Sequence, residues 1–323
     1  MEEDSRDQEG QCVGCAQGRA GWARLVRSTQ LAPSVVRLVQ GGPGYPACLG
    51  ALPDPPRQLF CIGDLTALGP APEALVAIVG TREATLYGLR VATALGRAFA
   101  EAGAIVVSGM ARGVDSAAHD AAIKAGGKTI AVLGTGPDLP YPVGNRDLHA
   151  RVAASGLIVS ESEPGTKAFQ GCFPRRNRII AALAKATIVV EAGHRSGAIN
   201  TATHAGVIGR LFAAVPGPID SPRSAGANQL IRDGGHLIGS IDDALGLLGL
   251  SRSRAVDRPA MGVTEAEVWD CLGAGEDGVD ALCSRSGLPV RSVMEAVSRL
   301  ELAGLVTRSP DGRIGRSLAS LTA

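Results

Sequence analysis

Six short apolar segments, separated by stretches with helical periodicity, constrain the fold of this chain more than any other feature. The segments are LVAIVG (75–80), AIVVSG (104–109), TIAVLG (129–134), LIVSE (157–161), TIVVE (187–191) and LFAAVP (211–216). They are apolar almost throughout rather than alternating, as expected for strands that are covered on both faces. We therefore expect an α/β domain with a doubly wound parallel sheet.

Helical patterns fill the intervals between these strands and continue after them. Helices are expected near 86–101, 114–125, 144–154, 174–185, 197–208 and 240–249, and then at 264–273, 278–286 and 289–303. A hairpin that turns at Pro310, Asp311 and Gly312 follows the last helix. Three helices and a two-stranded wing predict a small C-terminal winged helix-turn-helix domain.

The composition shifts along the chain predict four parts. They are residues 1–72, a polar N-terminal region with an extended lead-in; 73–250, the sheet domain; 251–261, a short charged linker; and 262–323, the winged-helix domain. The lead-in carries Pro and Gly throughout, with one short strand expected near Leu59–Ile62.

Charge and cysteine content exclude several classes of protein. The chain of 323 residues has 32 basic and 31 acidic side chains, so a global basic coat is ruled out and any anion site must be local. Seven cysteines, sparse and odd in number, indicate a reducing compartment rather than a disulfide framework. Cys12 and Cys15 form a CxxC pair, but Cys48 and Cys61 do not repeat its spacing, so no metal site is expected. The acidic start MEEDSRDQEG and the lack of a long apolar run predict a cytoplasmic protein without a membrane span.

Polar, glycine-containing loops follow all six predicted strands. The carboxyl ends of parallel strands meet at one edge of the sheet, where ligands bind in open α/β folds. Glycines let backbone N–H groups approach an anion, and the N-terminus of the next helix adds positive potential. Thr81, Ser108 and Ser196 add hydroxyl groups. A tight turn explains any one loop equally well, but six such loops on one edge favour a polyanion site.

Residues 164–190 form the strongest local charge feature. They contain no acidic residue and five basic ones: Lys167, Arg175, Arg176, Arg178 and Lys185. Phe169 and Phe173 lie in the same segment. Guanidinium groups beside aromatic rings are typical of single-strand binding, in which charge follows the phosphates and rings stack on bases. The alternative is that Phe173 covers a core and the arginines form a solvated face.

Motifs of nucleotide enzymes are incomplete. The first glycine of a P-loop ending in Gly127-Lys128-Thr129 would fall at Ala122, and Gly134-Thr135-Gly136 lacks the third glycine of the dinucleotide motif. The five histidines show no metal-binding spacing, and there is no GxSxG sequence. Three carboxylates at the polar edge are interpreted as orienting neighbouring arginines and amides rather than as catalytic: Asp115, Glu161 and Glu191.

At these motifs the sequence resembles the DprA (DNA-processing protein A, or Smf) family. The resemblance spans about residues 44–250 and is carried by GTR (80–82), SGMARGVDSAAH (108–119), GTGPDLPYPVGNRDL (134–148), FPRRNRII (173–180), VVEAGHRSGAINTA (189–202) and AVPGPID (214–220). It implies an extended Rossmann-like domain that forms a homodimer and binds single-stranded DNA. It also implies loading of the recombinase RecA in natural transformation, single-strand-binding protein as a further partner, and neither enzymatic activity nor a cofactor.

The candidate DNA-binding residues come from the loops and from the resemblance. The loops and the basic segment suggest Gly80, Thr81, Gly109, Gly113, Lys167 and Phe173, and the resemblance implies Arg82, Ser108, Arg112, Asn145, Arg175, Arg176, Asn177, Arg178, Ser196 and Gly197. No catalytic residue or metal ligand is expected. The chain departs from the family pattern at Val143, where a basic residue is common, and in residues 1–43, which lack the usual N-terminal domain pattern.

Two other functions remain open from the sequence. One is a Rossmann-type nucleotide-processing enzyme, similar to a phosphoribohydrolase, in which Glu191 is the residue to test. The other is a regulator that reads duplex DNA through residues 289–316. The tail has six arginines against three acidic residues, but its helix at 289–303, which would enter the groove, contains two acids, so a protein-interaction role fits equally well.

Overall fold

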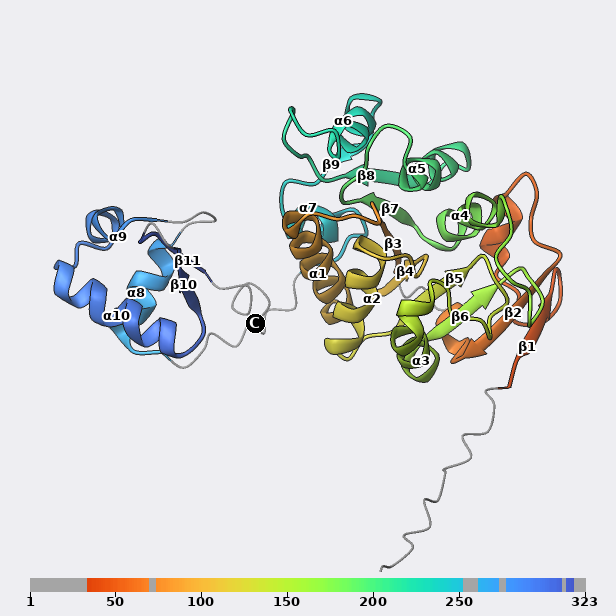
Figure 1. Cartoon of the computed structure of the whole chain (residues 1–323), viewed down its shortest axis with the longest axis horizontal. Helices are drawn as coiled ribbons and strands as arrows, with labels where there is room; N and C mark the ends of the chain where they lie inside the picture. Colours follow the sequence, from red (N-terminus) through yellow and green to blue (C-terminus); the bar gives the residue numbers. More distant parts are fainter. Residues whose placement is uncertain (1–33, 70–73, 252–260, 273–276, 310–311, 317–323) are drawn as a thin grey trace, which may run out of the picture. The chain divides into compact units, whose positions relative to one another are not determined.

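The computed structural model describes residues 34–69, 74–251, 261–272, 277–309 and 312–316 (Figure 1). The Cys12/Cys15 pair and the predicted turn residues Pro310 and Asp311 lie outside this range. The described residues form an α/β domain and a small C-terminal domain, which are treated separately below.

The α/β domain is built on a nine-stranded sheet with the order β1-β2-β6-β5-β4-β3-β7-β8-β9. The strands are β1 (Val36–Val39), β2 (Gln58–Gly63), β3 (Leu75–Val79), β4 (Ile105–Ser108), β5 (Thr129–Leu133), β6 (Leu157–Ser160), β7 (Ala186–Val189), β8 (Leu211–Ala214) and β9 (His236–Leu237). Strands β3 to β9 run parallel, whereas β1 and β2 are antiparallel. All six predicted parallel strands and the short strand near Leu59–Ile62 are confirmed.

Helices cover both faces of this sheet (Figure 1). They are η1 (Ala47–Ala51), η2 (Leu65–Leu68), α1 (Leu86–Glu101), α2 (Val114–Lys124), η3 (Val143–Asn145), α3 (Arg146–Ser155), α4 (Cys172–Leu183), α5 (Gly197–Val207), α6 (Ala225–Arg232) and α7 (Ile241–Gly246). Buried residues of α4, α5 and α6 form one core with the sheet, and those of α1, α2 and α7 form a second core on its other face. The doubly wound fold is therefore confirmed.

Strand β3 shows why its sequence is apolar throughout. Val76 and Ile78 belong to the core with α1 and α2, whereas Ala77 and Val79 belong to the core with α4 and α5. Successive side chains of a strand point to opposite faces, so a strand buried on both faces needs apolar residues at every position.

The structure adds three elements that the apolar runs do not predict. Strand β1 extends the sheet through β2, so residues of the predicted lead-in belong to the same sheet as β3. Helix α6 and the two-residue strand β9 follow β8. Strand β9, with two residues, is too short to show a period in the sequence.

The order of strands places a crevice between β3 and β7. Strand β3 pairs with β4 on one side and with β7 on the other, so the chain reverses its direction of winding at this point. The loops after the two strands consequently diverge. In open α/β sheets this switch point is where ligands bind.

The C-terminal domain is a winged helix. It comprises α8 (Val263–Cys271), α9 (Val279–Ser286), α10 (Val290–Leu302) and the antiparallel pair β10 (Val306–Arg308) and β11 (Ile314–Arg316). Its own core joins the three helices to the wing and includes Val268, Leu282, Val297 and Ile314. The predicted three helices and hairpin are confirmed.

Candidate functional site

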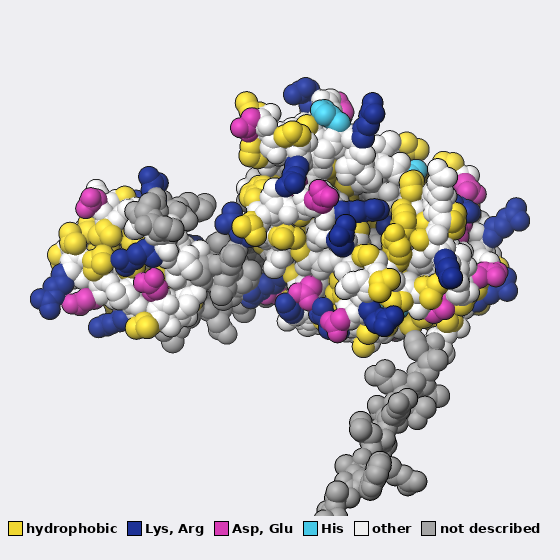
Figure 2. Space-filling view, viewed as in Figure 1, with side chains coloured by type: hydrophobic (Ala, Val, Ile, Leu, Met, Phe, Trp, Pro, Cys, Tyr) yellow, Lys and Arg dark blue, Asp and Glu magenta, His cyan; other side chains and the backbone are white. Residues whose placement is uncertain are grey.

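A pocket of about 600 Å³ opens at the switch point, at the carboxyl ends of β3, β4 and β7. We call it the rim pocket. It is lined by residues 79–83 after β3, by residues 111, 112 and 115 after β4, by residues 173, 174, 176, 177 and 180 of α4, and by residues 193–198 and 201 after β7. Figure 2 shows basic side chains beside hydrophobic ones in the middle of the visible face of the α/β domain.

Three exposed arginines line the rim pocket. They are Arg82, Arg112 and Arg195, which come from the loops after three different strands. Among the residues that the structure describes, no acidic side chain forms an ion pair with any of them. Their positive charge is therefore directed to solvent, where an anionic ligand can reach it.

Backbone groups complete the anion-binding character of the pocket. Helix α5 starts at Gly197, and Ser196 caps it by accepting a hydrogen bond from the Ala198 N–H. The free N–H groups of such a helix start and its dipole favour a negative charge. Gly113, which precedes α2, has a φ of 78°, and a Cβ there would collide with the Thr81 carbonyl oxygen. Glycine thus allows the loops after β3 and β4 to touch.

Buried contacts hold the loop after β4 in one conformation. Asp115 accepts hydrogen bonds from the N–H groups of Gly109 (3.1 Å) and Ala111 (3.3 Å). The Asn145 amide donates to the Met110 carbonyl oxygen at 2.7 Å. Met110 has a φ of 61°, which costs a non-glycine residue on the order of 1–3 kcal/mol. Asn145 and Asp115 therefore position the loop that carries Arg112.

An aromatic column borders the pocket. The Arg82 guanidinium lies 5.5 Å from the centre of the Phe173 ring, and the Tyr141 ring stacks on Phe173 with centroids 5.0 Å apart. Cation–π contacts of this kind at exposed sites contribute roughly 0.5–1 kcal/mol. Tyr141 remains exposed in this column. A flat ring of a ligand held by the arginines would therefore have an aromatic surface beside it.

Arg176 was predicted to contact the ligand, but the structure places it inside the protein with 7% of its surface exposed. Its guanidinium donates to the carbonyl oxygens of Gly109 (2.7 Å) and Val132. Burial lowers the pKa of Arg176 to about 10, and the nearby Asp115 opposes this shift. Arg176 thus fixes the ends of β4 and β5 rather than presenting charge to solvent.

Arg175 and Arg178 both pair with Glu161. Arg178 is buried and donates to both Glu161 carboxylate oxygens at 2.9 Å, and Arg175 donates to Oε1 at 2.9 Å. The predicted sharing of one helix face by these arginines is confirmed. Glu161, just outside the basic segment 164–190, thus supplies the carboxylate partner of two of its five basic side chains.

The remaining candidate residues divide into contacts within the protein and exposed positions. Ser108 is buried and donates to the Ile78 carbonyl oxygen, and the Asn177 amide donates to the Gly197 carbonyl oxygen. Lys167 is exposed in the loop before α4 and does not line the rim pocket. Of the predicted residues, the structure brings to the rim pocket Gly80, Thr81, Arg82, Arg112, Phe173, Arg176, Asn177, Ser196 and Gly197.

The three carboxylates of this edge bind neighbouring groups, as the sequence indicates. Glu191 is buried and accepts hydrogen bonds from the N–H and hydroxyl groups of Thr85 at 3.0 and 2.9 Å. A Cβ on Gly88 would collide with this carboxylate. Glu191 therefore anchors the start of α1.

Sequence reasoning missed Arg195 and Tyr141 as site residues. Arg195 directly precedes the cap of α5, and Tyr141 lies in a loop rich in Pro and Gly. The signal was present in both loops, because they follow predicted strands at the polar edge. To choose the side chain within each loop, one must know where that side chain points. The alternation of side chains along a strand does not predict this for a loop.

The C-terminal domain presents little uncompensated charge. Arg285 pairs with Asp277, Arg291 with Glu295, Arg299 with Glu265, and Arg308 with Glu301, at 2.7, 3.1, 2.7 and 3.9 Å. Arg316 lies over the Trp269 ring and donates to its carbonyl oxygen, and Arg313 also has a partner. The arginines expected to face a duplex are thus engaged within the domain.

A search for metal ligands and membrane spans found neither in the described part of the chain. No group of three His, Cys, Asp or Glu side chains there is arranged to hold a metal ion. None of the described helices has the length and apolarity needed to cross a bilayer.

Comparison with known proteins identifies two matching family models. The model described as DNA recombination-mediator protein A matches residues 37–249, and the DprA winged helix domain matches residues 257–312. A DprA relative from Mycobacterium tuberculosis is 43% identical over 263 residues, which cover 77% of this chain and 67% of the relative. The DNA processing protein DprA of Bacillus subtilis is 40% identical over 199 residues, or 62% of this chain and 66% of that protein.

Solved structures give the same result. DNA processing protein A from Streptococcus pneumoniae has a TM-score of 0.63 and 38% identity, covering 67% of this chain and 75% of that one. The protein of this name from Helicobacter pylori, whose structure concerns its single-stranded DNA binding mode, has a TM-score of 0.61 and 31% identity. It covers 67% of this chain and 96% of that one.

Proposed function

Because the chain belongs to the DprA family of DNA recombination-mediator proteins, we propose that it binds single-stranded DNA in the rim pocket. In this proposal the phosphates contact Arg82, Arg112 and Arg195 and the N-terminus of α5. The bases lie toward the aromatic column of Phe173 and Tyr141. Bound in this way, the protein loads a strand-exchange recombinase, RecA, onto DNA during transformation.

One observation carries the DNA-binding part of the proposal. Three exposed arginines from the loops after β3, β4 and β7 converge on one pocket without acidic partners among the described residues. Unpaired cations that meet at a helix N-terminus suit a chain of phosphates. The neighbouring rings favour a single strand over a duplex, because only an unpaired base exposes its face for stacking.

The candidate residues then take two roles. We assign direct contact to Gly80, Thr81, Arg82, Arg112, Gly113, Phe173, Arg195, Ser196 and Gly197, and support of the loops to Ser108, Gly109, Asn145, Arg176 and Asn177. Arg175 and Arg178 hold α4 through Glu161, and Lys167 lies beyond the pocket. We extend the proposal to a homodimer that acts by binding, without covalent chemistry or a cofactor. In it, residues 73–250 bind DNA and residues 262–323 form a separate domain.

A salt-titrated binding assay tests the proposal. Arg82→Ala is expected to weaken the binding of single-stranded oligonucleotides of mixed sequence. The loss of affinity is expected to be about equal for all sequences. Each lost phosphate contact makes the slope of log K against log salt shallower by about 0.7 for single strands. Arg37→Ala is the matched control, since Arg37 is exposed on β1 at the far edge of the sheet.

Two results contradict the proposal. Equal affinity and salt slope in the wild type, Arg82→Ala and Arg112→Ala place the DNA elsewhere. Release of free base from nucleoside monophosphates, abolished in Glu191→Gln, supports the enzyme alternative instead.

A further inference from the structure

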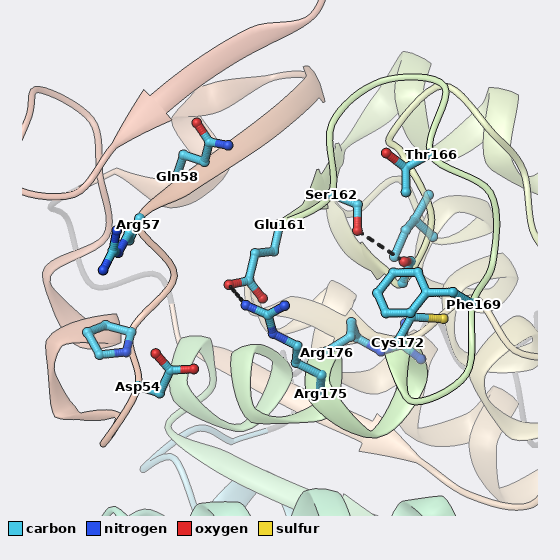
Figure 3. A pocket seen from close by; sticks show the side chains of 13 residues that line it. Asp54, Arg57, Gln58, Glu161, Ser162, Thr166, Phe169, Cys172, Arg175 and Arg176 are labelled. Atoms are coloured by element: carbon cyan, nitrogen blue, oxygen red, sulfur yellow. Dashed lines mark hydrogen bonds and ion pairs between the residues drawn. The ribbon is translucent and has the colours of Figure 1, made fainter.

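A second cavity of about 330 Å³ lies beside the first turn of α4, and Arg176 lines both this cavity and the rim pocket (Figure 3). Its walls come from Glu161 and Ser162 at the end of β6, Thr166 and Phe169 in the loop before α4, and Arg57 and Gln58 at the start of β2. The two hollows are therefore neighbours on the same edge of the sheet.

Three polar side chains that line this cavity have free hydrogen-bonding capacity. Within the described residues, the side chains of Arg57, Gln58 and Thr166 have neither a hydrogen bond nor an ion pair. The other polar walls are committed: Ser162 donates to the Gly134 carbonyl oxygen, and Glu161 accepts from two arginines. Convergent free polar groups in a hollow are the mark of a ligand site.

Phe169 supplies an aromatic wall. Its side chain is 49% exposed and, in Figure 3, lies beside Ser162 and Thr166. Phe173 is already stacked between Arg82 and Tyr141, whereas no ring contact involves Phe169 among the described residues. Its face is therefore free to stack on a flat group.

Most of the charge in the walls is already engaged. Three guanidinium groups, those of Arg57, Arg175 and Arg176, stand against the two carboxylates of Glu161 and Asp54. Arg175 is paired with Glu161, and Arg176 donates to backbone carbonyl oxygens, so of these three only Arg57 has no partner among the described residues. A volume of about 330 Å³ is at the small end of the range for ligand pockets, which suits one ring system rather than several.

We propose that this cavity takes one unstacked nucleobase of the strand whose phosphates occupy the rim pocket. The base stacks on Phe169, and its polar edge meets the hydroxyl of Thr166, which lies on the same side of the cavity (Figure 3). A Thr hydroxyl both donates and accepts, so it can pair with the edge of any of the bases. The inference rests on the proposed function and adds a base-binding site to it.

An abasic scan tests this site. A single abasic residue is placed at each position of a short oligonucleotide in turn, and its affinity is compared with that of the intact strand. In the wild type, one position is expected to lower the affinity about tenfold, because base stacking on an aromatic ring contributes substantially to binding. In Phe169→Ala the intact strand binds about tenfold more weakly, and the abasic residue at that position has no further effect.

Further variants separate the pocket from the rest of the interface. Thr166→Val is expected to reduce the penalty at the same position. A 2-aminopurine placed there is expected to lose fluorescence on binding in the wild type but not in Phe169→Ala. Leu86→Ala, an exposed residue of α1, serves as the control that retains the wild-type pattern.

The outcomes distinguish this inference from the function on which it rests. An abasic pattern that is identical in the wild type and Phe169→Ala overturns the base pocket, even where Arg82→Ala abolishes binding. Absence of any single-strand binding by the wild type overturns both. Phe169 is exposed in a surface loop, so Phe169→Ala is expected to fold. A misfolded variant would be recognised because it would also lose the Arg82-dependent binding.

Discussion

The arginines predicted to bind DNA have different environments here, and burial decides what each can do. Arg82 is exposed over Phe173, Arg178 is buried against Glu161, and Arg176 is buried against backbone carbonyl oxygens. Only an exposed guanidinium can exchange its hydration for a phosphate contact. The buried ones would first have to break bonds that hold the loops.

Arg176 and Arg82 are expected to differ in their effect on stability. Arg176→Met leaves the Gly109 and Val132 carbonyl oxygens without a donor and removes the cation near Asp115. A loss of at least about 2 kcal/mol in the free energy of unfolding is expected. Arg82→Ala is expected to lower stability by at most about 1 kcal/mol, since it removes an exposed side chain and its contact with the Phe173 ring. Urea unfolding of both variants measures this, and equal midpoints would show that the Arg176 contacts contribute little.

His119 is expected to make stability depend on pH. It is fully buried, its Nδ1 lies 2.7 Å from the Thr129 hydroxyl, and desolvation lowers its pKa to about 3. The unfolded chain binds a proton near pH 6.5 and the folded chain does not. Stability from this group is therefore complete above about pH 6.5 and falls by about 1.4 kcal/mol per pH unit from there toward pH 3.

His119→Gln isolates this contribution. Both chains share every other titrating group, so the difference between their unfolding free energies is expected to narrow as the pH falls from 7 to 5. A difference that stays constant over this range would show that His119 takes up its proton equally in the folded and unfolded chains.

At the scale of elements, Glu161 joins the end of β6 to α4. It receives Arg178, whose side chain is 8% exposed, and Arg175, whose side chain is 56% exposed. Glu161→Gln removes the counter-charge of a buried guanidinium, for which a loss of about 3 kcal/mol is expected. Glu101→Gln is the control, since Glu101 pairs with Arg97 on the exposed face of α1 and such pairs contribute at most about 1 kcal/mol. Thermal unfolding of the two variants compares them, and similar losses would contradict this role for Glu161.

The elements predicted from the sequence were those whose burial leaves a periodic record. The strand LVAIV of β3 is apolar at each position because both faces are covered, and α1 and α2 begin at the predicted residues. Strand β9 has two residues, His236 and Leu237, both exposed, so its place in the sheet depends on pairing with β8. Pairing with a distant segment leaves no local signal.

The site was predictable to the level of loops but not of side chains. The loops of Arg82, Arg112 and Ser196 were correctly expected at one edge, since parallel strands bring their carboxyl ends together. The burial of Arg176 and Arg178 was not, because Glu161, which neutralises Arg178, precedes the basic segment. A charge count over a chosen stretch omits partners that the fold supplies from outside it.

For the whole molecule, the charge distribution assigns different roles to the two domains. The α/β domain leaves Arg82, Arg112 and Arg195 without acidic partners among its described residues, whereas the arginines of the C-terminal domain are engaged within it. A duplex-reading helix needs side chains free to reach base edges. The exposed arginines of the winged helix, such as Arg291 and Arg299, would have to leave their carboxylate partners to reach base edges.

Removal of residues 257–323 is expected to change the affinity for single-stranded DNA by less than about threefold. The salt slope is expected to stay unchanged, because it counts phosphate contacts and we propose that these are made by the α/β domain. Arg82→Ala in the shortened chain is the internal control and is expected to weaken binding as it does in the full chain. Gel shifts with single-stranded and duplex probes at matched salt measure both effects. Loss of all binding on removal of the tail would assign DNA recognition to α10 and the wing, and the engaged arginines would then have to leave their partners to reach the DNA.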